Sequence, residues 1–118
     1  MNPVATIGYE AQTLAAVLDR LAAAGVDLVV DVRAVAASRR AGFSKTVLAA
    51  SLAERGIGYR HLRALGTPKS GREAARAGRV EEMRAIYEEH LAEPQAQSEL
   101  AQAAKLAGDR RLALLCYE

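Results

Sequence analysis

The residues best suited to chemistry in this 118-residue chain are an aspartate and an arginine separated by one residue, Asp31-Val32-Arg33. Because side chains alternate along a strand, Asp31 and Arg33 can point the same way, and the carboxylate can hold the guanidinium in place. An arginine fork oriented by a carboxylate suits bidentate recognition of a phosphate or carboxylate group. The same pair can instead be a structural ion pair that ties the following loop to the sheet. The residues alone leave both interpretations open.

Basic side chains surround this pair. Residues 33–79 hold eleven basic and two acidic side chains, a net charge of +9, so the rest of this +2 protein is net negative by about seven charges. Such a stretch indicates either an anionic partner or simply a solvated surface. The residues that we predict to bind a ligand are Tyr9, Arg33, Ser38, Arg39, Arg40, Lys45, Lys69 and Glu118.

Three residues are candidates for catalysis: Cys116, Asp31 and His61. Cys116 is a nucleophile if arginines and a helix dipole stabilise its thiolate, although an inert cysteine on an apolar strand is the commoner case. His61 can serve as an acid or base, or can be a strand-end residue bonded to backbone. Tyr9 can stack on a ligand or merely pack. The sequence leaves open whether chemistry follows binding.

The sequence contains only incomplete versions of the common cofactor and metal motifs. The segment Gly66–Gly71 has the glycine spacing of a phosphate-binding P-loop, but Arg72-Glu73 follow it where lysine and serine or threonine are needed. The segment Gly56-Ile57-Gly58 lies at the start of a predicted strand, whereas the glycines of a dinucleotide-binding fingerprint follow a strand. One cysteine and two distant histidines cannot supply a closed metal site. We therefore predict neither a metal nor a cofactor.

The elements that must position these residues alternate between strands and helices. Apolar runs predict strands over residues 4–7, 26–32, 57–62 and 111–117, the first of them buried. Helical patterns begin after the capping residues Thr13 and Ser44, and end at Gly25 and Gly56. Two further helices are predicted, one over residues 79–92 and one from Pro94 with Leu100, Ala103 and Ala104 on its inner face. Residues 33–43 and 63–71 are predicted to be loops.

This alternation predicts one three-layer α/β domain over residues 1–118, Rossmann-like in architecture. Its mainly parallel sheet has about four strands and helices on both faces. In such sheets the ligand sits beyond the carboxyl ends of the strands. The segments at those ends are Gly8-Tyr9-Glu10, Asp31-Val32-Arg33, His61-Leu62-Arg63 and Cys116-Tyr117-Glu118. The fold therefore predicts an arginine-rich mouth at one edge of the sheet.

Five motifs resemble the family known as domain of unknown function 488, in the same order along the chain. The motifs are Thr6–Glu10, Asp31–Arg33, Ser38–Lys45, His61–Lys69 and Leu114–Glu118. Members of that family usually continue past the Cys-x-Glu with an Asp-Pro, a Cys-His-Arg and a final helix. The resemblance therefore implies that this segment is missing after Glu118, which weakens a catalytic role for the cysteine.

A fainter similarity connects the chain to rhodanese-like sulfurtransferases, which also carry Asp-x-Arg after a buried strand and a cysteine at a later strand end. It depends on Asp31, Arg33 and Cys116 alone, and the loop of backbone amides that follows the rhodanese cysteine has no counterpart here. Fold does not determine function, so this similarity is an analogy.

Composition favours a globular cytoplasmic protein. Hydrophobic residues make up 51% and charged residues 25% of the chain. No apolar run approaches the ~20 residues that cross a membrane, the first residues lack a signal-peptide pattern, and a single cysteine suits a reducing compartment. Exposed edge strands are compatible with a homodimer.

The function that these observations predict is binding of a small phosphate- or nucleotide-like anion at the strand ends, with or without catalysis. A nucleic-acid-binding module is one alternative, which the basic stretch favours and the 4% aromatic content disfavours, because single-strand platforms stack bases on aromatic rings. A non-catalytic scaffold or sensor whose basic mouth docks an acidic partner is the other.

Overall fold

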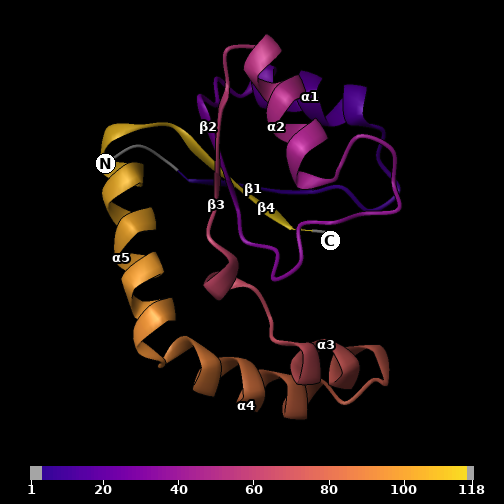
Figure 1. Cartoon of the computed structure of the whole chain (residues 1–118), viewed down its shortest axis with the longest axis vertical. Coiled ribbons are helices and arrows are strands. Elements are labelled where there is room, and N and C mark those ends of the chain that lie inside the picture. The colour runs from indigo at the N-terminus through magenta and orange to yellow at the C-terminus, as the bar shows by residue number, and fades with distance from the viewer. Residues whose placement is uncertain (1–3, 117–118) are drawn as a thin grey trace.

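A four-stranded parallel sheet organises the chain. The computed structural model describes residues 4–116, and Figure 1 shows the sheet between helices on its two faces. The strands are β1 (Ala5–Gly8), β2 (Leu28–Asp31), β3 (Gly58–His61) and β4 (Leu112–Cys116). They lie in the order β1-β4-β2-β3, with every pair parallel. This arrangement confirms the predicted three-layer, parallel α/β fold.

Two layers of helix cover the sheet. The helices are α1 (Leu14–Ala23), α2 (Lys45–Glu54), α3 (Lys69–Arg76), α4 (Val80–Leu91) and α5 (Pro94–Asp109), with a short 3₁₀ helix, η1 (Arg63–Leu65), after β3. Helices α1 and α2 cover one face, and α5 and η1 cover the other. Helices α3 and α4 pack together below the sheet in Figure 1.

Strand alternation divides the core into two clusters. Val29 and Leu115 point toward α1 and α2, whereas their neighbours Val30 and Leu114 point toward α5. Leu28, Val29, Val30 and Asp31 are all buried, as expected for an inner strand covered on both faces. The alternation of side chains along β2 therefore places Asp31, like Val29, on the face covered by α1 and α2.

The four predicted ends of α1 and α2 match the structure. Thr13 caps α1, since its hydroxyl accepts a hydrogen bond from the Ala16 N–H at 3.1 Å. Gly25 and Gly56 follow α1 and α2 with φ of 71° and 72°, the left-handed conformation that ends helices. Ser44 is the N-cap residue of α2 as predicted, but its hydroxyl makes no capping hydrogen bond and bonds the backbone of Ser38 instead.

Three other local predictions need correction. Residues 63–71 are not a loop, because η1 occupies the start of this segment and α3 begins at Lys69. Strand β1 lies at the sheet edge, so Val4, Ala5 and Thr6 are exposed and the strand is only partly buried. The buried residues of α5 are Ala96, Glu99 and Ala107, whereas Leu100 is exposed.

Side chains of α4 and α5 satisfy the backbone of η1. Glu99 accepts a hydrogen bond from the Ala64 N–H at 2.9 Å, and His90 Nε2 donates to the Ala64 carbonyl at 2.6 Å. The hydroxyl of Tyr87 donates to the Leu65 carbonyl. These contacts join α4 and α5 to the end of β3. Over residues 4–116, no helix combines the length and the apolar character needed to cross a bilayer.

Candidate functional site

Asp31 and Arg33 form a buried bidentate ion pair at the carboxyl end of β2. Arg33 Nε and Nη2 donate to the two carboxylate oxygens of Asp31 at 2.8 and 2.7 Å, and the Arg33 backbone N–H donates to the same carboxylate at 3.0 Å. The side chains of Asp31 and Arg33 are 0% and 6% exposed. Such a pair requires further hydrogen bonds to offset its desolvation.

Those further hydrogen bonds come from the residue after β1, from β3 and from the loop after β2. Arg33 Nη1 donates to the Tyr9 hydroxyl at 3.1 Å and to the Phe43 carbonyl at 2.7 Å. The Tyr59 hydroxyl donates to Asp31 Oδ2. All three guanidinium nitrogens of Arg33 thus donate within the protein, which favours the interpretation of Arg33 as a structural tie.

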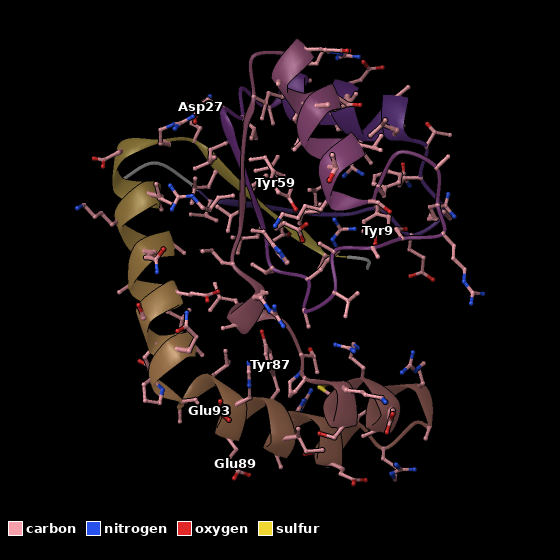
Figure 2. All side chains as sticks on the ribbon, viewed as in Figure 1. Tyr9, Asp27, Tyr59, Tyr87, Glu89 and Glu93 are labelled. Carbon is pink, nitrogen blue, oxygen red and sulfur yellow. The ribbon has the colours of Figure 1, made fainter. Side chains whose placement is uncertain are left out.

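Two aromatic rings enclose this network. The rings of Tyr9 and Phe43 stack with centroids 4.4 Å apart and an interplanar angle of 12°, and the Arg33 guanidinium carbon lies 5.3 Å from the Tyr9 ring centroid. Tyr9 and Phe43 are almost completely buried. Figure 2 shows Tyr9 and Tyr59 in the part of the molecule that contains the sheet and α2.

The network changes the pKa values of two of its members. Burial alone would lower the pKa of Arg33, but its hydrogen bonds to Asp31 and Tyr9 and the charge of Asp31 raise it overall. Burial raises the pKa of Tyr59 well above its usual range, and the hydrogen bond and charge of Asp31 raise it further, although Arg33 opposes this. Both groups therefore keep their protons at neutral pH.

His61 bonds the backbone beside this pair. Its Nε2 donates to the Arg33 carbonyl at 2.7 Å, so this ring nitrogen carries the proton. His61 also pairs in register with Asp31 across β2 and β3. The backbone-bonded alternative for His61 is thereby favoured, and its catalytic role stays a prediction.

The loop over residues 34–44, which follows Arg33, folds back on itself. The Ser44 hydroxyl accepts a hydrogen bond from the Ser38 N–H and donates one to the Ser38 carbonyl, and the Lys45 N–H donates to the Ala36 carbonyl at 2.8 Å. The Arg40 N–H donates to the Ser38 hydroxyl at 3.1 Å. Ser38 therefore shapes the loop and helps to place Arg40.

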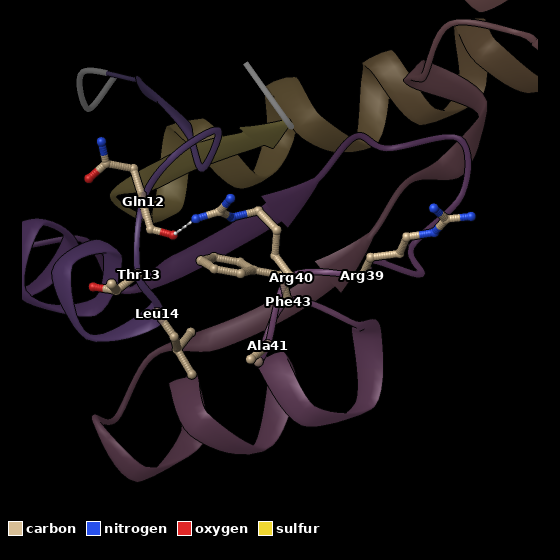
Figure 3. A pocket seen from close by; sticks show the side chains of 8 residues that line it. Gln12, Thr13, Leu14, Arg39, Arg40, Ala41 and Phe43 are labelled. Atoms are coloured by element: carbon tan, nitrogen blue, oxygen red, sulfur yellow. Dashed lines mark hydrogen bonds between the residues drawn. The ribbon is translucent and has the colours of Figure 1, made fainter.

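A pocket opens between this loop and the start of α1 (Figure 3). Its volume is about 580 Å³, and the residues that line it are Gln12, Thr13, Leu14, Arg39, Arg40, Ala41, Gly42 and Phe43. Arg40 Nη2 donates to the Gln12 carbonyl at 2.7 Å, a bond that joins the two sides of the pocket. Its Nε is buried and has no hydrogen-bond partner within residues 4–116.

Cys116 lies on the opposite face of the sheet from Asp31. It follows Leu112 and Leu114 in the alternation of β4, and both leucines belong to the cluster on the α5 face. Burial raises the pKa of Tyr87 on α4, and the charge of a Cys116 thiolate raises it further, which indicates that the thiol and this phenol are near one another. The structure does not join Cys116 to the Asp31–Arg33 pair.

The remaining predicted site residues are dispersed. Arg39 and Lys45 are exposed on the loop and at the start of α2. Lys69 is exposed at the start of α3, with its ammonium 4.0 Å from a Glu73 carboxylate oxygen. Glu118 lies outside the described residues, so its predicted role stays untested. Within residues 4–116, no group of three or more histidine, cysteine or acidic side chains is arranged to hold a metal ion.

Sequence reasoning missed Tyr59, Phe43 and Gln12. Tyr59 was detectable, because it lies two residues before His61 on β3 and pairs in register with Val29, which places it on the α1–α2 face with Asp31. Phe43 and Gln12 contribute backbone carbonyls, and no pattern of side chains in the sequence predicts which carbonyl will accept a hydrogen bond.

Comparison with known proteins gives a family and no activity. No curated protein and no solved structure matches the chain. One family model matches residues 13–118, which includes the Asp31–Arg33 pair, the loop over residues 34–44, η1 and β4. The match covers far more than half of the sequence, and the chain therefore belongs to the family described as Domain of unknown function DUF488.

Proposed function

We propose that this protein binds a small phosphate-bearing molecule in the pocket between the start of α1 and the loop over residues 34–44. The observation that carries the proposal is a cavity of about 580 Å³ with Arg39 and Arg40 on its wall. This volume lies within the range of small-molecule sites, roughly 300 to 1,000 Å³. Arginine presents a planar fork that matches the geometry of phosphate oxygens.

Arg40 is the residue best placed to hold the anion. Its Nη2 is anchored on the Gln12 carbonyl, and its Nη1 makes no hydrogen bond with any residue from 4 to 116 and is not enclosed. The two N–H groups of Nη1 are therefore available to a ligand, and the anchor at Gln12 reduces the entropy lost when they bind.

Helix α1 adds a favourable field. Thr13 and Leu14, at the amino end of this ten-residue helix, line the same pocket. The amino end of a helix carries a partial positive charge, which stabilises an anion placed beside it. The helix field and the two arginines thus act in the same direction.

In this proposal Asp31 and Arg33 are positioning residues. Arg33 holds the loop through the Phe43 carbonyl at 2.7 Å, and Phe43 stacks on Tyr9 at the end of β1. The buried pair thereby connects the loop that carries Arg39 and Arg40 to two strands of the sheet. Direct contact of Arg33 with the ligand is not part of the proposal.

The test is a titration of the ¹⁵N-labelled protein with inorganic phosphate at low ionic strength, followed by amide NMR. We expect saturable shifts at Leu14 and at residues 39–42. Arg40→Gln should weaken the binding about tenfold or more, because a charge-assisted hydrogen bond to phosphate is lost.

Arg84→Gln is the matched control. Arg84 is an exposed arginine on α4 whose one ion pair within the described residues is with Glu81, so this variant loses the same charge far from the pocket. It should bind phosphate as the unaltered protein does. Equal affinities of the Arg40→Gln variant and the unaltered protein would exclude this pocket as the site.

A further inference from the structure

The two arginines of the pocket extend in different directions. In Figure 3 the Arg40 side chain reaches toward Gln12, whereas Arg39 extends away from it. Arg39 is exposed and makes no hydrogen bond or ion pair with the rest of residues 4–116. One arginine is thus anchored and the other can change rotamer, so their guanidinium groups do not converge on one small anion in this structure.

The pocket carries two uncompensated positive charges. Its lining includes Arg39 and Arg40 and no acidic side chain. A cavity of about 580 Å³ also leaves room beyond a single phosphate group. Charge and size together match an anion with two linked phosphoryl groups better than an isolated phosphate.

We propose that the ligand carries a diphosphate, with one phosphoryl group on Arg40 at the start of α1 and the other on Arg39. This inference rests on the proposed function of the same pocket. The anchored Arg40 binds one phosphoryl group in either ligand, while the exposed Arg39 adds a second contact only when a second phosphoryl group is present. Arg39 is thereby the residue that distinguishes a diphosphate from a monophosphate.

Calorimetric titrations with inorganic phosphate, inorganic pyrophosphate and adenosine diphosphate test this division of roles. We expect pyrophosphate to bind about tenfold more tightly than phosphate, the effect of one added charge-assisted contact. Adenosine diphosphate that binds more tightly than pyrophosphate indicates that the pocket also recognises the nucleoside. Equal affinities of these two ligands indicate that it recognises the diphosphate alone.

Two variants separate the arginines. Arg39→Gln should weaken pyrophosphate binding more than phosphate binding and so abolish the preference for pyrophosphate, whereas Arg40→Gln should weaken the binding of both ligands. Arg39→Gln alters an exposed side chain that makes no hydrogen bond or ion pair within residues 4–116, so we expect this variant to fold. Arg40→Lys, which keeps the charge and loses the fork, serves as a second variant should the glutamine loosen the loop, and it should also bind both ligands more weakly.

Two outcomes would overturn the inference and leave the proposed function intact: equal binding of phosphate and pyrophosphate, or an unchanged preference in the Arg39→Gln variant. Tighter binding of a ten-nucleotide single-stranded DNA than of pyrophosphate would overturn it in favour of a nucleic-acid surface. No binding of either phosphate ligand would overturn the proposed function itself.

Discussion

At the scale of single residues, the Asp31–Arg33 pair is the most tightly connected feature of the described chain. A buried pair is weak evidence for stability by itself, because desolvation offsets much of the attraction. Removing one partner is a different matter, since the other charge is then buried without compensation. Removing the Arg33 guanidinium would also take a hydrogen-bond donor from the Tyr9 hydroxyl and from the Phe43 carbonyl.

Arg33→Met should lower the free energy of unfolding by about 3–5 kcal/mol, because it leaves the Asp31 carboxylate buried without its guanidinium. Urea denaturation at neutral pH measures the change. Arg55→Met is the control: it breaks an exposed ion pair with Asp19, whose oxygen lies 3.2 Å away, and should cost less than about 1 kcal/mol. If both variants lost a similar free energy of unfolding, the buried Arg33 pair would contribute no more to stability than the exposed Arg55 pair.

Because of Tyr59, the free energy of unfolding should depend on pH in the alkaline range. Its pKa in the folded protein is raised above the ordinary tyrosine value of 10.0 by burial and by Asp31. The contribution of its protonated hydroxyl is therefore fully present below about pH 10 and is lost as the pH rises further, because the unfolded chain ionises first. Tyr87, whose pKa is also raised, acts in the same direction.

Tyr59→Phe should therefore give a shallower decline of the unfolding free energy between pH 9 and 11, with a difference of at most about 1.4 kcal/mol per pH unit. At pH 8 the variant should already be less stable by about 1 kcal/mol, since the Asp31 carboxylate loses a donor. Urea denaturation of both proteins at several pH values gives the two slopes. Parallel slopes would contradict a raised pKa of Tyr59.

At the scale of elements, the close approach of η1 to the end of β2 depends on a glycine. A Cβ added to Gly66 would lie 2.2 Å from the Ala34 nitrogen and 2.6 Å from the Val32 carbonyl oxygen. Both are backbone atoms, so neither can rotate away. The space between Gly66 and the loop after β2 is therefore too small to hold a methyl group.

Gly66→Ala should destabilise the fold by roughly 1–3 kcal/mol, because η1 or the loop after β2 must shift to relieve the overlap. Gly108→Ala is the matched control: its Cβ would meet nothing within 4 Å, and within α5 it should stabilise the protein by up to about 1 kcal/mol. Thermal unfolding of both variants distinguishes the two cases. A neutral Gly66→Ala would indicate that η1 moves freely relative to the sheet.

At the scale of the whole molecule, the sequence predicts the alternation of elements well and their relative placement less well. Apolar runs and helix-terminal glycines are local signals, so the strands, α1 and α2 follow from them. Helix α3 was missed because Pro68 and Gly71 are typical of loops. In the structure Gly71 is buried, and a Cβ there would lie 2.7 Å from the Thr67 side chain and 3.4 Å from the Ile86 side chain on α4, so this glycine lets Thr67 pack closely against the first turn of α3.

The candidate site shows the same division. The shared orientation of Asp31 and Arg33 follows from strand parity and is confirmed by their hydrogen bonds. The bonds of Arg33 to Tyr9 and of Arg40 to Gln12 join segments 24 and 28 residues apart, and no local pattern encodes such distances. Parity along β4 was available for Cys116 and would have separated it from Asp31 at once.

The position of β4 in the sheet has a consequence for the order of folding. Among the strands of residues 4–116, β4 comes last in the sequence, yet it lies between β1 and β2 and is the one strand that pairs with β1. A growing chain that has not yet released Leu112–Cys116 from the ribosome can pair β2 with β3, but β1 has no strand to pair with. Strand β1 can therefore join the sheet only after β4 has been synthesised, and the sheet closes only after translation has passed β4.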